Sequence, residues 1–324
     1  MRFSVIIPLY NKAPYVAKAI QSVLVQSFTN YELVIVDDGS QDRSVEIAER
    51  LLEGHNNYCL IRQENMGVSV ARNNGVAASS GDYLCFLDAD DWWEPTFLEE
   101  MSKLIVEFPD AGIYGTNYTI VNEAKRKTRV SPIGVEPGFE KGYINYCQVY
   151  AKTLAMPLTS ISVAIPRLVF EEEQGFPKDI KLGEDFLLWI HIALNHKVVF
   201  LNKPLANYNQ DVDADHRGVG RLYQPKEHML WNLTDLNIIE QTNQDYKQLI
   251  DNLRTYELMP YLLDNRYYVE ARRELDKVDW HRQPALVCRI YRNPIWLLRI
   301  RRWVLRKGSS AKRYCLKVTS RFIK

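Results

Sequence analysis

The sequence predicts an α/β fold with a mostly parallel central sheet, helices on both faces, and a helical extension towards the C-terminus. Over about the first 110 residues, short apolar runs rich in β-branched side chains alternate with stretches of helical periodicity. The connections are short, and such alternation is typical of a parallel sheet covered on both faces. From about Gln224 to about Lys277, helical patterns dominate and turn signals are few.

The N-terminal part of the chain supplies its predicted elements in a regular order. Four short apolar runs are expected to form strands, at residues 3–9, 32–36, 58–62 and 83–87, and the first two are expected to be buried. Stretches with apolar side chains at helical spacing separate them, at residues 14–26, 45–52 and 68–78. Pro95 is expected near the start of a further helix, where its missing N–H costs little.

The following part of the chain is predicted to be more mixed. Strands are expected at residues 113–121, 161–165, 198–200 and 205–208, and helices at 167–173 and 183–194. A charged turn or hairpin arm is expected at 123–129, and loops at 134–142 and 209–220. The chain therefore divides into an α/β domain at 1–222, a helical extension at 223–280 and a basic tail at 281–324.

The net charge of +1 hides a strong asymmetry. Residues 281–324 hold 13 Lys and Arg and no Asp or Glu, so the rest of the chain has a net charge of −12. A helix is predicted at 294–306, where tryptophans oppose arginines. Such a segment favours an anionic membrane surface, reached through residues 290–324, and the alternative is packing against the acidic body. Nucleic acid is not expected as a partner, because no nucleic-acid-binding module is recognisable.

The cysteines and the N-terminus bear on the compartment. The five cysteines are scattered without a CxxC pair, which favours free thiols in a reducing compartment and argues against zinc. The N-terminus lacks the apolar core of a signal peptide, and no apolar run approaches the roughly 18 residues that span a bilayer. A cytoplasmic protein, peripheral on the inner face of the cell membrane, is expected.

Polar side chains follow three of the predicted strands at the point where each strand ends. Parallel sheets bind ligands beyond the carboxyl ends of their strands, so these side chains are expected to share one edge of the sheet. The three clusters are Tyr10-Asn11, Asp37-Asp38-Gly39-Ser40 and Asp88-Ala89-Asp90-Asp91.

The cluster Asp88-Ala89-Asp90 predicts a metal site. Alternate carboxylates at a strand end can converge on a hard cation, and Mg²⁺ or Mn²⁺ commonly combines one or two carboxylates with substrate phosphates. Such a cation neutralises the charge that develops on a diphosphate leaving group. Asp38 is a candidate acceptor for hydrogen bonds from a base or ribose, and the alternative is a simple Asp-Gly turn.

Three further candidates lie outside these clusters. Glu184-Asp185 opens a predicted helix, either as a general base for an acceptor hydroxyl or as ordinary acid placement against the helix dipole. Arg72 is placed to reach a phosphate or to form a surface ion pair. His216, in a polar loop, is either a metal ligand or an exposed histidine.

Several short motifs also occur in a fixed order between about residues 3 and 210. They are Ser4-Val5-Ile6-Ile7-Pro8-Leu9-Tyr10-Asn11, Gln26-Ser27-Phe28, Val36-Asp37-Asp38-Gly39-Ser40, Asn65-Met66-Gly67, Ala71-Arg72-Asn73, Gly81-Asp82-Tyr83, Leu87-Asp88-Ala89-Asp90-Asp91 and Gly183-Glu184-Asp185. This series resembles family 2 glycosyltransferases in order and spacing. The combination is specific, although no single motif is.

The resemblance implies a GT-A fold and transfer of a sugar, with inversion at the anomeric carbon, from a nucleotide-sugar whose default nucleotide is UDP. It implies that Asp185, or otherwise Glu184, is the catalytic base. It also implies that Asp88, Asp90 and His216 hold Mn²⁺ or Mg²⁺. The implied donor-binding residues are Pro8, Tyr10, Asn11, Asp38, Asn65, Arg72, Asp88 and Ala89.

The Gln-x-x-Arg-Trp motif of processive family members does not follow the acidic motif, which favours the addition of single sugars. The implied acceptor is a glycan or a polyprenyl-diphosphate-linked molecule in cell-surface polysaccharide synthesis. Two alternatives are a sugar nucleotidyltransferase and a catalytically degenerate binding or scaffold protein. The first needs a Gly-rich, Arg-containing first loop, where this chain has Pro8-Leu9-Tyr10-Asn11. The intact acids argue against the second.

Overall fold

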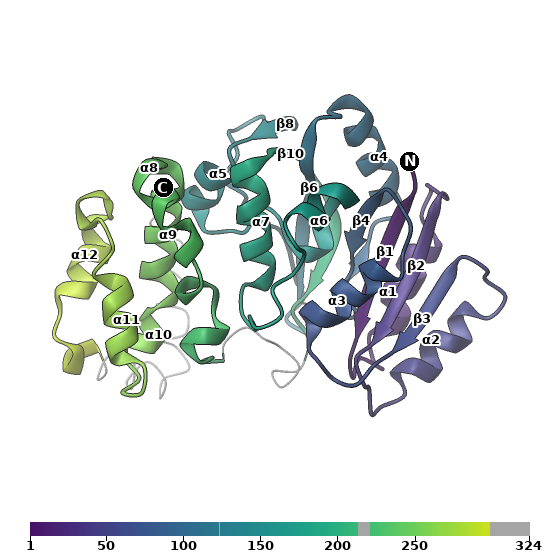
Figure 1. Cartoon of the computed structure of the whole chain (residues 1–324), viewed down its shortest axis with the longest axis horizontal. Coiled ribbons are helices and arrows are strands. Elements are labelled where there is room, and N and C mark those ends of the chain that lie inside the picture. The colour runs from purple at the N-terminus through teal and green to yellow at the C-terminus, as the bar shows by residue number, and fades with distance from the viewer. Residues whose placement is uncertain (123, 213–220, 299–324) are drawn as a thin grey trace.

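The computed structural model describes residues 1–122, 124–212 and 221–298 (Figure 1). The strands are β1 Phe3–Leu9, β2 Tyr31–Asp37, β3 Tyr58–Arg62, β4 Tyr83–Phe86, β5 Trp92–Trp93, β6 Ala111–Asn122, β7 Lys127–Val130, β8 Lys141–Ile144, β9 Val163–Pro166 and β10 Lys197–Asn209. The helices are α1 Val16–Leu24, α2 Ser44–Leu52, α3 Val68–Ala77, α4 Phe97–Glu107, α5 Tyr146–Thr153, α6 Arg167–Glu172, α7 Glu184–Asn195, α8 Asn237–Thr242, α9 Gln244–Glu257, α10 Met259–Leu262, α11 Tyr268–Leu275 and α12 Ala285–Arg292.

The strands form one 10-stranded sheet in the order β3-β2-β1-β4-β9-β6-β10-β5, with β7 beside β6 and β8 beside β10. Strands β3, β2, β1 and β4 are mutually parallel. Strand β9 is antiparallel to both β4 and β6, so β6 and its parallel neighbour β10 run in the direction of β4. The predicted mostly parallel sheet is confirmed, and the reversed strands are short.

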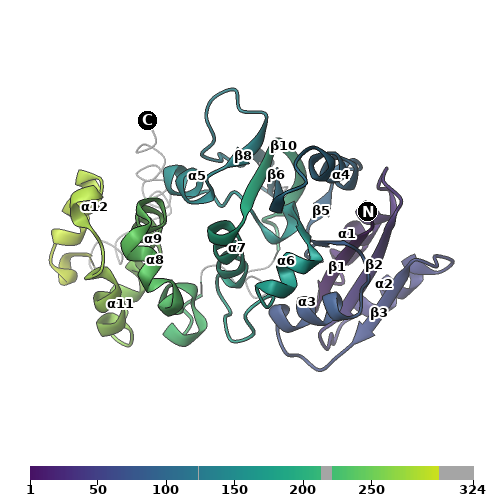
Figure 2. The ribbon, with the colours of Figure 1, turned by 45° about the horizontal axis from the view of Figure 1, so that its top comes forward.

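Helices cover the sheet because its central strands are apolar on both faces. Phe3, Val5, Ile6 and Ile7 of β1 are all 0% exposed. Helix α3 packs on β1 and β2, and α7 packs on β6 and β10; Figure 2 shows α3, α6 and α7 in a row along one side of the sheet. The close approach of α3 requires Gly75, since a Cβ there would lie 2.5 Å from Ile6 Cγ2.

Three details of the predicted strands were wrong. The two-residue strand β5 was not predicted. The strands expected at 198–200 and 205–208 are one strand, β10, which continues beside β6 through register shifts around Pro204. The exposed Asn202 and Lys203 interrupt the apolar pattern there, although the backbone stays paired. The loop expected at 134–142 ends in strand β8, which pairs with β10. The residues of β8 are polar and half-exposed, so the sequence did not indicate a strand there.

A helical extension follows the sheet, as predicted, and occupies the green and yellow end of the ribbon (Figure 1). Helix α9 packs against α5 of the sheet-containing part. Inside the extension, the 1% exposed Arg254 donates to Glu240 at 2.9 Å and lies within ion-pair distance of Asp251 and Glu274. This buried charge network ties α8, α9 and α11 together.

The basic tail lies mostly outside the described residues, as does the larger part of the 209–220 loop. The helix predicted at 294–306 is described only at its start, where residues 295–298 are helical, and the rest of it lies outside the described residues, as does the candidate ligand His216. Within the described residues, the structure contains no helix with the length and hydropathy needed to cross a bilayer.

Candidate active site

The turn after β1 is held by Asn11, whose backbone is in the left-handed region with φ 50°. Its backbone N–H donates to Ser40 Oγ at 3.1 Å, and its side-chain Oδ1 accepts from the Gln41 N–H at 2.8 Å. The turns after β1 and β2 are therefore fastened together. This is the edge at which the sequence predicted a ligand site.

Asp38 extends this edge to the loop before α3. Its carboxylate is 4% exposed and accepts hydrogen bonds from Gln63 Nε2 at 2.8 Å, the Met66 N–H at 2.8 Å and the Gly67 N–H at 2.9 Å. The local Asp-Gly turn is made instead by Asp37, whose Oδ1 accepts from the Ser40 N–H. Asp38 thus fixes the start of α3, the helix that carries Arg72.

Asp88 stands at the end of β4 and faces two elements that are distant in sequence. Its Oδ1 accepts from Arg72 Nη2 at 2.7 Å. Its Oδ2 lies 3.3 Å from the Ser160 hydroxyl, in the 3₁₀ turn before β9. Both carboxylate oxygens therefore have a polar neighbour, and the side chain keeps 30% of its surface exposed towards the edge of the sheet.

The other two aspartates of the cluster have separate partners. Asp90 Oδ2 accepts from Lys12 Nζ at 2.5 Å. Asp91 is 2% exposed and accepts from the Asn209 N–H at 2.7 Å, which joins the aspartate turn to the end of β10. The turn is thus fixed to both the first and the last long strand of the sheet.

Crowding of these acids affects their protonation. Burial raises the pKa of Asp90, the Lys12 ammonium opposes that rise, and the Asp88 carboxylate adds to it. Burial also raises the pKa of Asp91 well above its usual range, and the charges of Asp90 and Asp88 add to the effect. The carboxylates of this cluster therefore repel one another, and a bound cation would relieve that repulsion.

The donor chemistry of this cluster fits a hard divalent cation. Asp88 and Asp90 are separated by one residue, and both offer carboxylate oxygens. Asp90 already accepts a hydrogen bond from the ammonium group of Lys12. Within the described part of the chain, no group of three or more His, Cys, Asp or Glu side chains is arranged to hold a metal. Two carboxylates leave positions for phosphate oxygens, which is how Mg²⁺ and Mn²⁺ commonly bind with a substrate.

The second acidic motif is carried on the first turn of α7. Gly183 precedes the helix with φ 83°, and a Cβ there would lie 2.3 Å from Met229 Sδ. Only glycine suits both the left-handed backbone and this close contact. The turn presents Glu184 and Asp185 on the side of the sheet that carries Arg72, and the Phe186 N–H donates to Asp185 Oδ1 at 2.8 Å.

Arg72 connects the two acidic motifs. It is 3% exposed, and its guanidinium donates to Asp88 Oδ1 at 2.7 Å and to Glu184 Oε1 at 3.0 Å. Residues from α3, from the end of β4 and from the start of α7 therefore meet at one point. In the structure, both terminal nitrogens of Arg72 have carboxylate partners. The predicted contact between Arg72 and a phosphate stays a prediction.

Asp185 is an acid whose surroundings raise its pKa. Burial raises the pKa of Asp185 to about 7, the neighbouring Glu184 carboxylate adds to the rise, and Arg72 opposes it. General bases are most effective when their pKa lies near the operating pH. The same burial separates Asp185 from ordinary acids at helix N-termini, which stay ionised and solvated.

The remaining predicted donor-binding residues lie along the same edge. Pro8 is half-buried in β1, and Tyr10 is 44% exposed directly after this strand. Asn65 is exposed in the loop that Asp38 fixes. Ala89 is buried between the two aspartates. Their predicted contacts with a donor stay predictions.

Two residues that touch the acids were missed by the sequence interpretation. Lys12 directly follows the polar pair after β1, and its position there was the signal that could have indicated it. Ser160 gave no signal, since it lies in a short turn far along the chain and reaches Asp88 only through the sheet order.

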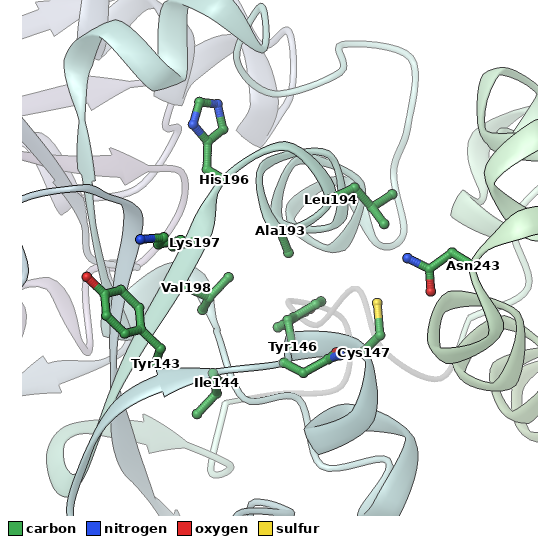
Figure 3. Close-up of a pocket in the computed structure, with 11 residues that line it drawn as sticks. Tyr143, Ile144, Tyr146, Cys147, Ala193, Leu194, His196, Lys197, Val198 and Asn243 are labelled. Atoms are coloured by element: carbon green, nitrogen blue, oxygen red, sulfur yellow. The ribbon is translucent and has the colours of Figure 1, made fainter.

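A cavity of about 500 Å³ lies elsewhere, between β8, the start of α5, the end of α7 and the start of β10. Figure 3 shows Ala193 and Leu194 on the helix and Lys197 on the strand. The 12-residue helix α7 is about 18 Å long. Because Glu184 begins this helix and Leu194 is near its end, the cavity is separate from the acidic site.

The fold is similar to that of two proteins solved in complex with nucleotide-sugars. S. aureus TarS in complex with UDP-GlcNAc superposes with a TM-score of 0.58 at 19% identity, over 85% of this chain and 70% of the TarS chain. The mannosyltransferase PcManGT from Pyrobaculum calidifontis, in complex with GDP-Man and Mn²⁺, superposes with a TM-score of 0.52 at 16% identity, over 87% of this chain and 88% of its own. The fold is therefore GT-A, as the motif resemblance implied.

Sequence comparison assigns the family. The model of glycosyl transferase family 2 matches residues 4–164. Glycosyltransferase GlyA of Streptococcus pneumoniae is 37% identical over 216 residues, which is 64% of this chain and 30% of GlyA. The chain thus spans about a third of the length of that relative. Over residues 4–164, the chain is a member of glycosyltransferase family 2.

Proposed function

We propose that the chain is a metal-dependent, inverting glycosyltransferase that moves one sugar from a nucleotide-sugar to an acceptor hydroxyl. The observation that carries this proposal is the bridge made by Arg72 between Asp88 and Glu184. It brings the carboxylates suited to a diphosphate-bound cation close to Asp185, a carboxylate suited to proton abstraction. A single displacement needs these two functions on either side of the sugar.

Asp185 acts in this proposal on the acceptor. Its carboxylate accepts the proton of the acceptor hydroxyl while the oxygen forms a bond to the anomeric carbon. The bond from that carbon to the diphosphate oxygen breaks on the opposite face, and the electron pair leaves with the diphosphate. One such displacement inverts the anomeric configuration. Arg72 orients Glu184 and Asp88, and so holds the two sides of the site at a fixed separation.

Asp90 and Asp88 are the residues that would hold the cation, together with oxygens of the donor diphosphate. When bound, the cation would neutralise the negative charge that develops on the leaving diphosphate. Two known structures of this fold support the proposal, since TarS is seen with UDP-GlcNAc and PcManGT with GDP-Man and Mn²⁺. We propose UDP as the nucleotide of the donor. We also propose that residues 1–222 form the catalytic domain.

A panel of nucleotide-sugars tests the proposal. We expect one UDP-sugar to raise the melting temperature in the presence of Mn²⁺, because a ligand at 100 times its Kd stabilises a protein by about 2.7 kcal/mol. The same donor is expected to stabilise much less after chelation of the metal, and to release UDP when a suitable acceptor is added. A chain that neither binds a nucleotide-sugar nor releases a nucleoside diphosphate would contradict the proposal.

The pH dependence of transfer tests the role of Asp185. Because a base must be deprotonated, kcat/KM is expected to rise with pH through the Asp185 pKa of about 7. Glu184 contributes to the raised pKa, so Glu184→Gln is expected to shift this limb of the profile to lower pH. The profile of kcat/KM against pH is the measurement. A limb that stays in place in Glu184→Gln would mean that Asp185 is not the titrating group.

We also propose that the C-terminal end contacts an anionic membrane that carries a lipid-linked acceptor for cell-surface polysaccharide synthesis. In support, Arg289 and Arg292 are exposed on α12, and Trp296 and Leu297 follow at 61% and 40% exposure. Apolar and cationic side chains in one segment suit an anionic lipid surface.

Vesicle sedimentation tests this contact. The full chain is expected to bind phosphatidylglycerol vesicles, to release them at high salt, and to ignore phosphatidylcholine vesicles. Deletion of residues 290–324 is expected to abolish binding, and the single change Trp296→Ser to weaken it. Vesicle binding that persists after the deletion would rule out this segment as the membrane contact.

A further inference from the structure

The positively charged ammonium of Lys12 lies beside Asp90, one of the carboxylates proposed to hold the metal. The ammonium donates to Asp90 Oδ2 at 2.5 Å, and the two side chains are only 14% and 17% exposed. The pair joins the turn after β1 to the turn after β4. A divalent cation on the same carboxylate would face this ammonium at close range.

The backbone around Lys12 fixes where its side chain begins. The Lys12 N–H donates to Ser44 Oγ at 2.7 Å, and its carbonyl accepts from the N–H groups of Tyr15 at 2.8 Å and Val16 at 2.9 Å. The preceding Asn11 has a left-handed backbone that hydrogen bonds to the 40–41 turn maintain. Such strained positions persist only where the surroundings determine them. The backbone from which the Lys12 side chain reaches Asp90 is therefore fixed, and both side chains are mostly buried.

We propose that Lys12 is an internal counter-ion that competes with the divalent cation for Asp90 and transfers to the donor diphosphate when the cation binds. The proposal rests on the function proposed above. The cation and the ammonium compete for Asp90, because two positive charges repel each other at one carboxylate. The diphosphate offers the displaced ammonium a new anionic partner. Metal and donor are thereby coupled through one side chain.

Two binding properties follow from this exchange. The ligand-free protein binds Mn²⁺ weakly, because the cation has to displace Lys12 from Asp90. A nucleoside diphosphate strengthens Mn²⁺ binding, because it accepts the displaced ammonium as well as the metal. Coupling between two ligands is reciprocal, so Mn²⁺ strengthens nucleotide binding by the same factor. Removal of the Lys12 ammonium should strengthen the binding of Mn²⁺ to the ligand-free protein. It should also reduce the factor by which the nucleotide strengthens Mn²⁺ binding.

The experiment measures Mn²⁺ binding by the electron paramagnetic resonance signal of free Mn²⁺, with and without UDP or GDP, in the full chain. We expect Lys12→Met to bind Mn²⁺ alone on the order of tenfold more tightly than wild type, a change of about 1.4 kcal/mol. The factor by which UDP strengthens Mn²⁺ binding is expected to fall by a similar amount. Lys12→Arg keeps the charge and is expected to behave as wild type.

Lys103→Met is the matched control, since it removes the same charge from an exposed lysine on α4 that pairs with Glu99 and Glu100. It should leave Mn²⁺ binding unchanged. An unchanged or weakened affinity for Mn²⁺ in a folded Lys12→Met variant overturns the counter-ion role while the proposed function stands. If the wild-type chain binds no Mn²⁺ even with UDP or GDP, both the counter-ion role and the metal-dependent function fail.

Discussion

Replacing Asp185 with asparagine is expected to preserve donor binding and to lower the rate of sugar transfer by about 10²–10⁴-fold, the usual contribution of a general base. The amide has the size of the carboxylate and its Oδ1 can still accept from the Phe186 N–H, so the first turn of α7 should keep its conformation. It has no basic oxygen to receive the acceptor's proton. The measurements are kcat for transfer and the Kd of the nucleotide-sugar.

Asp179→Asn provides the control for this experiment, because it makes the same chemical change at an exposed position in the loop before α7. It should leave both kcat and the donor Kd unchanged. Transfer by Asp185→Asn at the wild-type rate would assign the base to another residue. A large loss of donor affinity with little change in kcat would instead place Asp185 in the donor site.

The inner parallel strands β2, β1 and β4 could be predicted from sequence because they are buried on both faces. A run such as Phe3 to Leu9 is then almost continuously apolar, and neither a surface strand nor an amphipathic helix gives that pattern. The strands that were missed lack it. Strand β5 has two residues, and β8 carries polar, half-exposed side chains, so neither has an apolar periodicity to detect.

The edge that carries the site was predictable for a related reason. Parallel strands place their carboxyl ends together, so clusters that follow β1, β2 and β4 must lie close in space. The structure brings them into direct contact, since Asn11 donates to Ser40 and Lys12 donates to Asp90. What the pattern could not supply was the choice of partner. It offered Asp38 as a contact for the nucleotide or as part of a simple Asp-Gly turn, whereas the folded chain uses this carboxylate to hold the loop before α3.

The contact between Arg72 and Glu184 shows the limit of this approach. The two residues are 112 positions apart, and their meeting depends on the order in which β9, β6 and β10 join the sheet. Motif spacing does not determine that order. Sequence interpretation therefore left Arg72 as either a phosphate ligand or a surface ion pair, and the structure makes it a buried connector between two acidic motifs.

Arg72→Met is expected to lower the free energy of unfolding by about 3 kcal/mol, because it leaves Asp88 and Glu184 without the buried guanidinium that compensates them. The methionine side chain keeps much of the buried volume, so loss of charge is the main change. Urea denaturation measures the effect. Since the loss arises from uncompensated carboxylates, it is expected to shrink at acidic pH, where carboxylates take up protons. Arg62→Met, at an exposed pair with Glu49, should change stability by less than about 1 kcal/mol.

The same variant is expected to move the pH profile of transfer in the direction opposite to Glu184→Gln. Arg72 lowers the pKa of Asp185, so its removal should raise that pKa above about 7 and shift the rising limb of kcat/KM to higher pH. Glu184→Gln should shift the limb to lower pH. Opposite shifts require that both side chains act on one titrating group, since a general loss of structure would lower activity at every pH. Shifts in the same direction would show that the profile reports a group other than Asp185.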